Sequence, residues 1–206
     1  NSTTRTSSSG TAGIAVSKAD QIPYNFVTCS EAQTLASGMS ADTDKTSSLL
    51  FGIQWDLVCK FLEGKDGLKT TDINSDSTEW GNYKNSSLTL SRGMYLIEPS
   101  NSSNVWTIFS EDTINYVTSS QTSNNASYKQ MLTTRASEDT NKMNIYDLAG
   151  NEWEWTLEHA SSNSELPCAS RGGNYINNGS TDPASVRYHY RISNSAYDIS
   201  FRSTLY

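Results

Sequence analysis

The sequence predicts an α+β domain, and three observations lead to this prediction. Two segments in the first third of the chain have apolar residues at helical spacing. From Leu68 onward, short apolar stretches alternate with Asn, Ser and Gly, which is typical of short strands and loops. No internal repeat is present. Helices early in the chain and short strands later are the pattern of an α+β fold in which loops carry much of the surface.

The chain of 206 residues is long enough for one domain with a substantial core. Residues 1–18 begin with NSTTRTSSSGTAG, a tract too polar to offset the entropy of ordering, so we expect a flexible tether there. No linker divides the rest, and residues 19–206 are expected to form a single domain that starts near Ala19. No apolar run is long enough for a transmembrane helix.

Two amphipathic helices are expected before residue 68. In SEAQTLASGM, Ser30 and Gln33 stand in capping-box register ahead of Ala and Leu residues at helical spacing. The second helix lies in SSLLFGIQWDLVCKFLEGKDG and should end at Gly64 or Gly67. Its core-facing stripe is predicted to be Ile53, Leu57, Val58, Phe61 and Leu62.

Charge and cysteine content exclude some partners and some sites. The net charge of -7 argues against nucleic acid or an anionic membrane as the partner, because phosphates favour clustered Lys and Arg. Cys29, Cys59 and Cys168 stand in no CxxC or Cys/His pattern that would suggest zinc. We expect buried free thiols, with a disulfide as the alternative.

The string NIYDLAGNEWEWT, residues 144–156, has the most specific pattern in the chain. It predicts a strand beginning with Ile145 and Leu148, a turn at residues 150–151, and a further strand that carries Trp153 and Trp155. Two tryptophans at positions i and i+2 lie on the same face of a strand. We therefore expect this pair to anchor the core.

Five motifs occur in order between about Leu49 and Arg202: FGIQWDLVCKF around Trp55, then WGNY, GNEWEW, SRGGNY and DISFR. They resemble EAEWEYAAR, WGN, GNVWEW, RGGSW and IGFR of the formylglycine-generating enzyme and sulfatase-modifying family. The resemblance implies a C-type lectin fold, with two helices around a small irregular antiparallel sheet and long loops. It also implies that the N- and C-terminal halves are adjacent and that Trp55, Trp153 and Trp155 are buried.

The resemblance does not extend to the metal ligands of the family's enzymes. The oxidising members hold copper with two cysteines after the RGG motif, and this chain has none there. Members that use non-haem iron need a set of histidines and a carboxylate, and this chain has two histidines, His159 and His189. We therefore expect no enzymatic activity, with a formylglycine-generating-like oxidase as the alternative. Glu154 matches the Glu through which members bind calcium, so a structural calcium ion there is one expectation, and hydrogen bonds to loop amides are the favoured one.

The segment from Asn174 to Ser200 has an unusual composition. It contains no Lys, Glu, Gln, Met or Trp, which random sampling at the chain average would give roughly once in 100 segments of this length. An AAC codon whose adenines are replaced can encode every amino acid except those five. The missing residue types are therefore those that adenine-directed mutation cannot produce.

The segment is similar to the variable region of the variable proteins of diversity-generating retroelements, which share the same fold. In those proteins a reverse transcriptase that errs at adenines rewrites the C-terminal segment between RGG and a terminal GFR. The resemblance implies that residues 170–202 form a diversified surface for a protein or cell-surface ligand, on a phage tail or a bacterial cell surface. Receptor binding or adhesion is the implied function, through residue types that also dominate antibody loops. No nucleic acid and no membrane insertion are expected, and a non-binding structural tail or surface module is a further alternative.

The candidate site divides into constant and variable positions. The framework is expected to comprise Arg171, Gly172, Gly173, Pro183, Ala184 and Phe201. The predicted ligand-binding residues are Asn174, Ile176, Asn177, Asn178, Thr181, Asp182, Val186, Tyr188, His189, Tyr190, Arg191, Tyr197 and Asp198.

Within this set, Tyr188, His189, Tyr190 and Arg191 are predicted to form one central aromatic and cationic patch. His189 is expected to contact the ligand and not a metal. Apart from Ile176 and Val186, which are equally compatible with core positions, the candidates should be exposed on one face. Tyr175 is expected to pack in the core. Replacing both patch tyrosines with Ala should then hardly affect folding.

Overall fold

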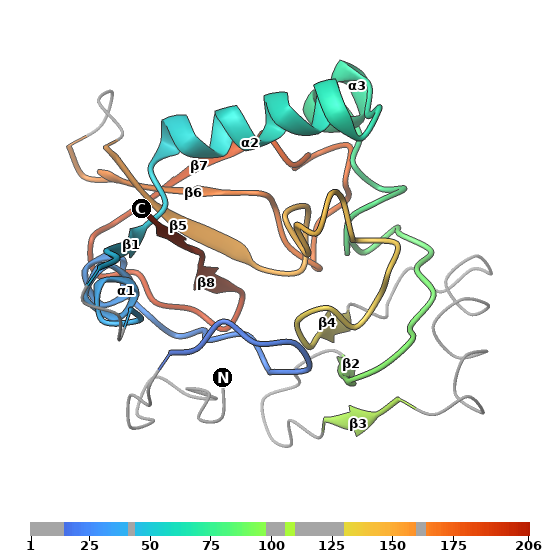
Figure 1. Ribbon diagram of the computed structural model, residues 1–206, viewed down its shortest axis with the longest axis horizontal. Helices are drawn as coiled ribbons and strands as arrows, with labels where there is room; N and C mark the ends of the chain where they lie inside the picture. Colours follow the sequence, from blue (N-terminus) through green and yellow to red (C-terminus); the bar gives the residue numbers. More distant parts are fainter. Residues whose placement is uncertain (1–14, 41–43, 98–105, 110–129, 160–163) are drawn as a thin grey trace.

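The computed structural model describes residues 15–40, 44–97, 106–109, 130–159 and 164–206 (Figure 1). Most of the expected tether and part of the region of short strands expected after Leu68 lie outside these residues. The helices are α1 (Cys29–Ser37), α2 (Gly52–Lys65) and α3 (Thr70–Asn74). The strands are β1 (Ser47–Leu49), β2 (Met94–Ile97), β3 (Thr107–Ile108), β4 (Gln130–Leu132), β5 (Trp153–His159), β6 (Cys168–Arg171), β7 (Arg187–Tyr190), β8 (Ile199–Phe201) and β9 (Ser203–Leu205).

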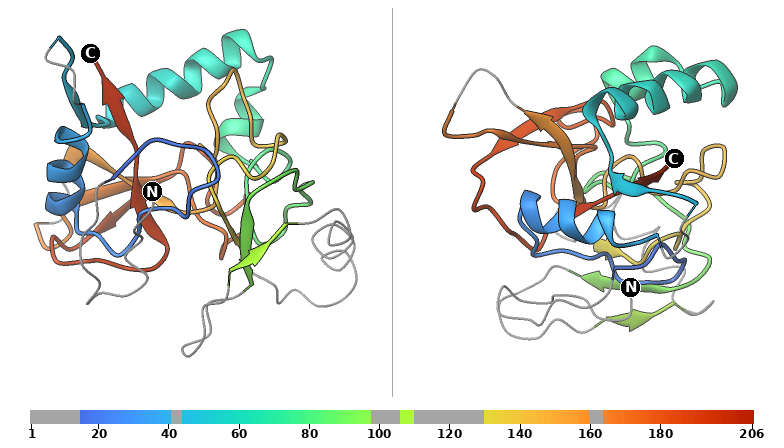
Figure 2. Two further views of the ribbon diagram at one scale, coloured as in Figure 1. Left: turned by 60° about the horizontal axis from the view of Figure 1, so that its bottom comes forward. Right: turned by 60° about the vertical axis from the view of Figure 1, so that its left-hand side comes forward.

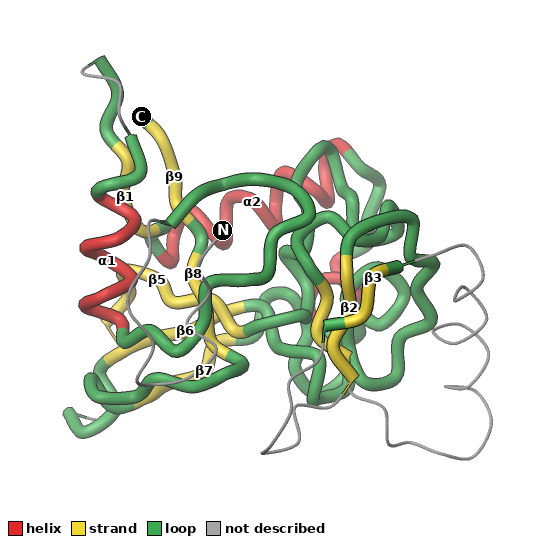
Figure 3. Tube along the Cα trace, turned by 90° about the horizontal axis from the view of Figure 1, so that it is seen from below, coloured by secondary structure: helices red, strands yellow, loops and turns green. Residues whose placement is uncertain are grey.

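The described strands form three small sheets, with orders β1-β9, β3-β2-β4 and β7-β6-β5-β8. The last of these, the main sheet, is mixed, because β5 and β8 run parallel while its other pairs are antiparallel. The expectation of a purely antiparallel sheet is therefore wrong. After β7, the loop of residues 191–198 carries the chain back along the sheet to its opposite edge, so β8 arrives in the direction of β5. The β3-β2-β4 sheet lies at the end of the molecule away from α1 (Figure 3).

The two halves of the chain are adjacent, as the sequence predicted. Strand β1 pairs with β9, and Ser48 lies opposite Thr204 (Figure 2). The packed part of the chain begins earlier than the predicted Ala19, since Ala15 is buried in a cluster that includes Trp155. The described residues contain no helix with the length and apolar character needed to cross a membrane.

Helix α1 confirms a predicted helix but begins differently. Its N-cap is Thr28, whose hydroxyl accepts a hydrogen bond from the backbone N–H of Glu31, and the Glu31 carboxylate accepts from the N–H of Thr28. The predicted pair, Ser30 and Gln33, lies two residues further on. Both pairs have capping-box spacing, and the helix begins at the earlier one.

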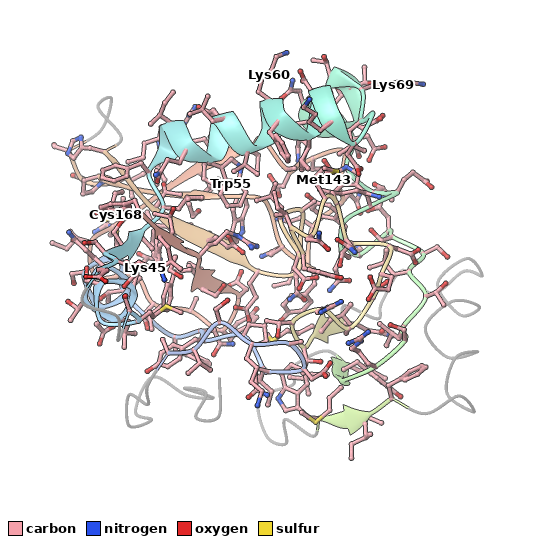
Figure 4. The ribbon with its side chains drawn as sticks, in the orientation of Figure 1. Lys45, Trp55, Lys60, Lys69, Met143 and Cys168 are labelled. Carbon is pink, nitrogen blue, oxygen red and sulfur yellow. The ribbon has the colours of Figure 1, made fainter. Side chains whose placement is uncertain are left out.

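Helix α2 lies along one face of the main sheet, but its predicted stripe is largely wrong. Ile53 and Leu57 are 66% and 61% exposed, whereas Trp55 and Leu62 are fully buried. The bulky indole of Trp55 sets the rotation of the helix, and its Nε1 donates to the carbonyl of Ala184 at 2.9 Å. Figure 4 shows Trp55 on the side of α2 that faces the strands. The third helix, α3, was not predicted.

The string GNEWEW is the centre of the fold. Trp153 and Trp155 are 3% and 0% exposed and belong to one core cluster, which confirms the predicted anchor. Leu148 and Ile145 precede β5 in turns and not in a strand of their own. Asn151 has a left-handed φ of 64°, and its side chain accepts from the N–H of Leu132 at 2.9 Å, so the predicted turn joins the main sheet to β4.

Candidate functional site

Strand β7 carries the centre of the predicted site, and its geometry divides that site in two. Successive side chains of a strand point to opposite faces of the sheet. Tyr188 and Tyr190 therefore lie on one face, and Arg187 and His189 lie on the other. The prediction that Tyr188, His189, Tyr190 and Arg191 form a single patch is wrong for this reason.

The two tyrosines rest on the core tryptophans. The ring centroid of Tyr188 lies 5.6 Å from that of Trp153, and Tyr190 lies 5.4 Å from Trp155. The tyrosine centroids are 5.0 Å apart. These contacts cross β6, where Ser170 stands opposite Tyr188 in the register and leaves room for the rings. The aromatic side chains of β7 are thus held in place by the core of the domain.

Two loops place polar groups near these rings. Asn174 Nδ2 donates to Asp198 Oδ2 at 2.7 Å, and Asn174 Oδ1 accepts from the backbone N–H groups of Ile176 and Asn177 at 3.1 and 3.2 Å. Asn177 Nδ2 in turn donates to the Asp182 carboxylate. Asn174 is 2% exposed, so its prediction as an exposed contact residue is wrong. Its amide organises the loop.

The charges of Asp182 and Asp198 act on the Tyr190 hydroxyl. Burial raises the pKa of Tyr190, and the charges of Asp198, Tyr188 and Asp182 raise it further. Burial also raises the pKa of both Asp carboxyls, against the opposing effect of their hydrogen bonds. We refer to Tyr188, Tyr190, Asp182 and Asp198 as the tyrosine patch.

The opposite face of β7 is tied to helix α2. Arg187 forms an ion pair with Glu158 of β5, and its Nη2 lies 3.4 Å from Asp56 Oδ2. Arg171 is 1% exposed and also pairs with Asp56. His189 is half-buried on this face. Ion-paired side chains therefore occupy this face of β7.

The RGG motif allows the loops to approach one another. Gly172 and Gly173 have φ of 90° and 76°, in the left-handed region that favours glycine. A Cβ on Gly173 would lie 2.3 Å from the Asp182 carbonyl oxygen, and one on Gly172 would lie 2.8 Å from that of Leu148. The absence of side chains at both positions lets the loop that holds Asp182 pack closely.

Exposure divides the predicted residues into three groups. The exposed ones are Asn178, Thr181, Tyr188, Arg191 and Tyr197. The half-buried ones are Ile176, Asn177, Asp182, Val186, His189, Tyr190 and Asp198, and Asn174 is buried. Ile176 and Val186 pack against core clusters, in line with the core alternative, and Tyr175 is fully buried. Of the expected framework, Phe201 is half-buried and Arg171, Gly172, Gly173, Pro183 and Ala184 are buried.

Glu154 has a partner that the sequence interpretation did not include. Its Oε1 and Oε2 accept hydrogen bonds from Arg202 at 2.7 and 2.8 Å, so the favoured expectation of loop amides as its partners is wrong. Burial raises the pKa of Glu154, while Arg202 acts to lower it. A calcium ion at this carboxylate would have to compete with the guanidinium. The described residues contain no group of three or more His, Cys, Asp and Glu arranged for a metal.

The three cysteines are free thiols, as expected, but Cys29 and Cys168 are half-buried and not buried. Cys59 lies on the buried side of α2, and burial raises its pKa to about 12. Burial also raises the pKa of Cys29 to about 12, with a smaller contribution from neighbouring Cys168. Thiols with such a pKa remain protonated at neutral pH and react slowly.

A pocket of about 550 Å³ lies between the chain from Ala15 to Tyr24 and the turn of residues 144–147. None of the predicted ligand-binding residues lines it.

This arrangement of helices and sheets is shared with solved structures. No known family matches the sequence, and no curated protein does. The crystal structure of CarF matches with a TM-score of 0.54 at 14% identity, over 90% of this chain and 67% of CarF. Variable protein 1 of Treponema denticola matches with a TM-score of 0.50 at 12% identity, over 98% of this chain and 77% of that protein. The chain has the fold of a variable protein. The fold expected from the five motifs is thereby confirmed at the level of its overall architecture.

The sequence did not predict the contact of the site with the core tryptophans or the ion pairs that hold Arg187. The contact of Tyr188 with Trp153 follows from the alternation in RYHY, once β6 is known to lie between β7 and β5. The order of the strands in the sheet is known only once the fold is known. The anchor of Arg187 on Glu158 and Asp56 joins residues far apart in the chain, and no local pattern indicates it.

Proposed function

We propose that the chain is a ligand-binding protein whose segment 170–202 is diversified by a retroelement to present a variable binding surface. The observation that carries the proposal is the composition of residues 174–200, which lack the five residue types that adenine replacement in an AAC codon cannot produce. The similarity in fold to a protein named as a variable protein supports it.

The arrangement of the segment supports the same function. The backbone is held by the buried residues Arg171, Pro183 and Ala184. Thr181 lies between them in the sequence, Tyr188 follows them, and both are exposed. A surface of this kind tolerates new side chains at exposed positions, since surface substitutions usually change the free energy of unfolding by about 0.5 kcal/mol or less. Diversity can therefore arise without loss of the fold.

In this proposal the protein acts by binding and not by catalysis. The exposed Tyr188, Arg191 and Tyr197 are residue types that supply most of the binding energy at protein interfaces. The ligand is a protein or another molecule on a cell surface, and the carrier is a phage tail or a bacterial surface.

Sequencing the gene in many members of a host population tests the proposal. We expect a nearby repeat, nearly identical to the coding sequence of residues 170–202, and differences among copies confined to its adenines. The exposed positions Asn178, Thr181, Tyr188, Arg191 and Tyr197 should vary most. The matched controls are the buried Arg171, Gly172 and Ala184, which should be constant. A segment that is identical among copies, or that differs equally at buried and exposed positions, would contradict diversification.

A further inference from the structure

The two carboxylates of the tyrosine patch are held in fixed positions. Asn174 bonds to Asp198, Asn177 bonds to Asp182, and the Asn174 side chain accepts from the backbone N–H of Asn177. These bonds form a continuous amide link between the two acids. The two carboxylates are therefore held by hydrogen bonds in one connected loop structure, and their charges act on the Tyr190 hydroxyl.

This charge has no cationic partner in the described part of the chain. The described ion pairs involve other carboxylates, and none places a Lys, Arg or His nitrogen within 4.0 Å of Asp182 or Asp198. Arg191, which directly follows β7, has its Nη2 3.6 Å from Glu165 Oε2. The buried Glu154, by contrast, is paired with Arg202. Uncompensated carboxylates that are half-buried favour a cation supplied from outside.

The aromatic rings provide the second half of a cation site. Tyr188 is 51% exposed, and its ring lies 5.0 Å from that of Tyr190 and 5.6 Å from that of Trp153. The face of an aromatic ring attracts cations, and a guanidinium can stack on it while its N–H groups bond to a carboxylate. The net charge of -7 further attracts a basic partner over longer distances.

We propose that the tyrosine patch binds a cationic side chain of a protein partner, and that arginine is its best fit. The guanidinium stacks on Tyr188 and donates hydrogen bonds to Asp198 and Asp182. This inference rests on the proposed function, since it assigns a chemistry to the same binding surface. A neutral glycan would use the rings and amides but would leave the two charges uncompensated.

Two peptides that differ only in the charge of their two side chains test the site. The probes are an acetylated and amidated Gly-Arg-Gly-Arg-Gly peptide and the same peptide with citrulline, which replaces guanidinium by neutral urea. Binding to the isotopically labelled full chain is followed by NMR shifts of the Tyr188 and Tyr190 rings and of the Asp198 carboxylate. We expect the arginine peptide to bind about tenfold more tightly or better, because its hydrogen bonds are charge-assisted.

Substitution of the two aspartates tests whether the preference for arginine arises at the tyrosine patch. Asp198→Asn and Asp182→Asn each keep an oxygen to accept the existing amide bond, and each should reduce the preference for arginine to about threefold or less. Asp66→Asn, an exposed acid just beyond α2 on the opposite side of the main sheet, is the control and should leave the preference unchanged. Retained spectral dispersion shows that each variant is folded.

Equal binding of the two peptides, or shifts that do not involve the patch, would overturn the proposal. An arginine preference that survives both Asp substitutions would also overturn it. These outcomes leave the proposed diversification intact, because that function is decided by variation among gene copies. Invariant gene copies together with a confirmed arginine preference would instead remove the diversification and keep the site.

Discussion

Tyr190 packs edge-on against Trp155, with ring centroids 5.4 Å apart and planes inclined by 79°. A residue of the predicted variable segment thus rests on a residue that holds the core. Trp155 is fully buried, and its Nε1 donates to the Val27 carbonyl at 2.8 Å. Tyr188 makes a looser contact with Trp153 and remains half exposed. The two tyrosines should therefore contribute differently to folding.

Substitution of each tyrosine by Ala should separate these contributions. We expect Tyr190→Ala to lower the free energy of unfolding by about 2 kcal/mol, because it removes buried ring area and the edge contact. Tyr188→Ala should cost about 0.5 kcal/mol. The expectation from sequence that both are nearly neutral then applies to Tyr188 alone. Urea unfolding measures both values, and equal losses would contradict the difference in burial.

Helix α2 allows a matched comparison of two leucines. Leu62 is fully buried, so Leu62→Ala should lower the free energy of unfolding by about 3 kcal/mol through lost transfer energy and a cavity. Leu57 is 61% exposed, and Leu57→Ala should change it by about 0.5 kcal/mol or less. Urea unfolding measures both changes in the free energy of unfolding. A larger loss at Leu57 would show that the sequence-based stripe, and not the observed rotation, faces the core.

Helix α2 illustrates how far the sequence predicts this fold. The existence of the helix and its end at one of two glycines followed from local pattern, because apolar spacing and a glycine act over a few residues; the helix runs past Gly64 to Lys65, and Gly67 follows its C-cap with a φ of 77°. Its rotation did not follow from the apolar spacing, because both Ile53 and Trp55 are apolar; the burial of Trp55 was implied by the family resemblance alone. Motifs around the tryptophans succeeded because large buried rings restrict the surrounding sequence strongly.

The site shows the same division. Composition located the segment, and the alternation of RYHY was sufficient to split β7 between two faces. The burial of Asn174 could not be predicted, because it depends on Asp198, which is brought to it by the return loop after β7. The parallel strand β8 escaped prediction for the same reason, since a crossover is a property of the whole fold and not of a local pattern.

Arg171 and Asp56 should be strongly coupled. Asp56→Asn leaves the guanidinium of the fully buried Arg171 without its main countercharge, so we expect the free energy of unfolding to fall by about 2 to 3 kcal/mol. Burial already lowers the pKa of Arg171, and Asp56 opposes that effect. Arg171→Met should cost less when Asp56 is already Asn, which a double-mutant cycle measures. Additive losses would contradict the pairing.

The stability of the protein should depend on pH through Glu152. This residue is 3% exposed, and burial raises its pKa well above the ordinary 4.5, with a further contribution from the charge of Asp198. Because the folded state binds the proton more tightly than the unfolded chain does, the associated stability is fully present below about pH 4.5 and is lost as pH rises through the folded pKa.

Glu152→Gln should remove this dependence. The variant keeps the oxygen that accepts from Asn25 Nδ2 at 3.1 Å but carries no charge at any pH. We expect it to be more stable than the natural chain at neutral pH, with a difference that shrinks toward pH 4.5 by up to about 1.4 kcal/mol per pH unit. Urea unfolding between pH 4 and 8 checks this, and Glu79→Gln, at an exposed position, is the control. Acids whose pKa is raised independently of Glu152, such as Asp147, contribute equally to both chains and cancel in the difference. Parallel stability curves for the natural chain and Glu152→Gln would mean that burial does not hold a proton on this carboxyl.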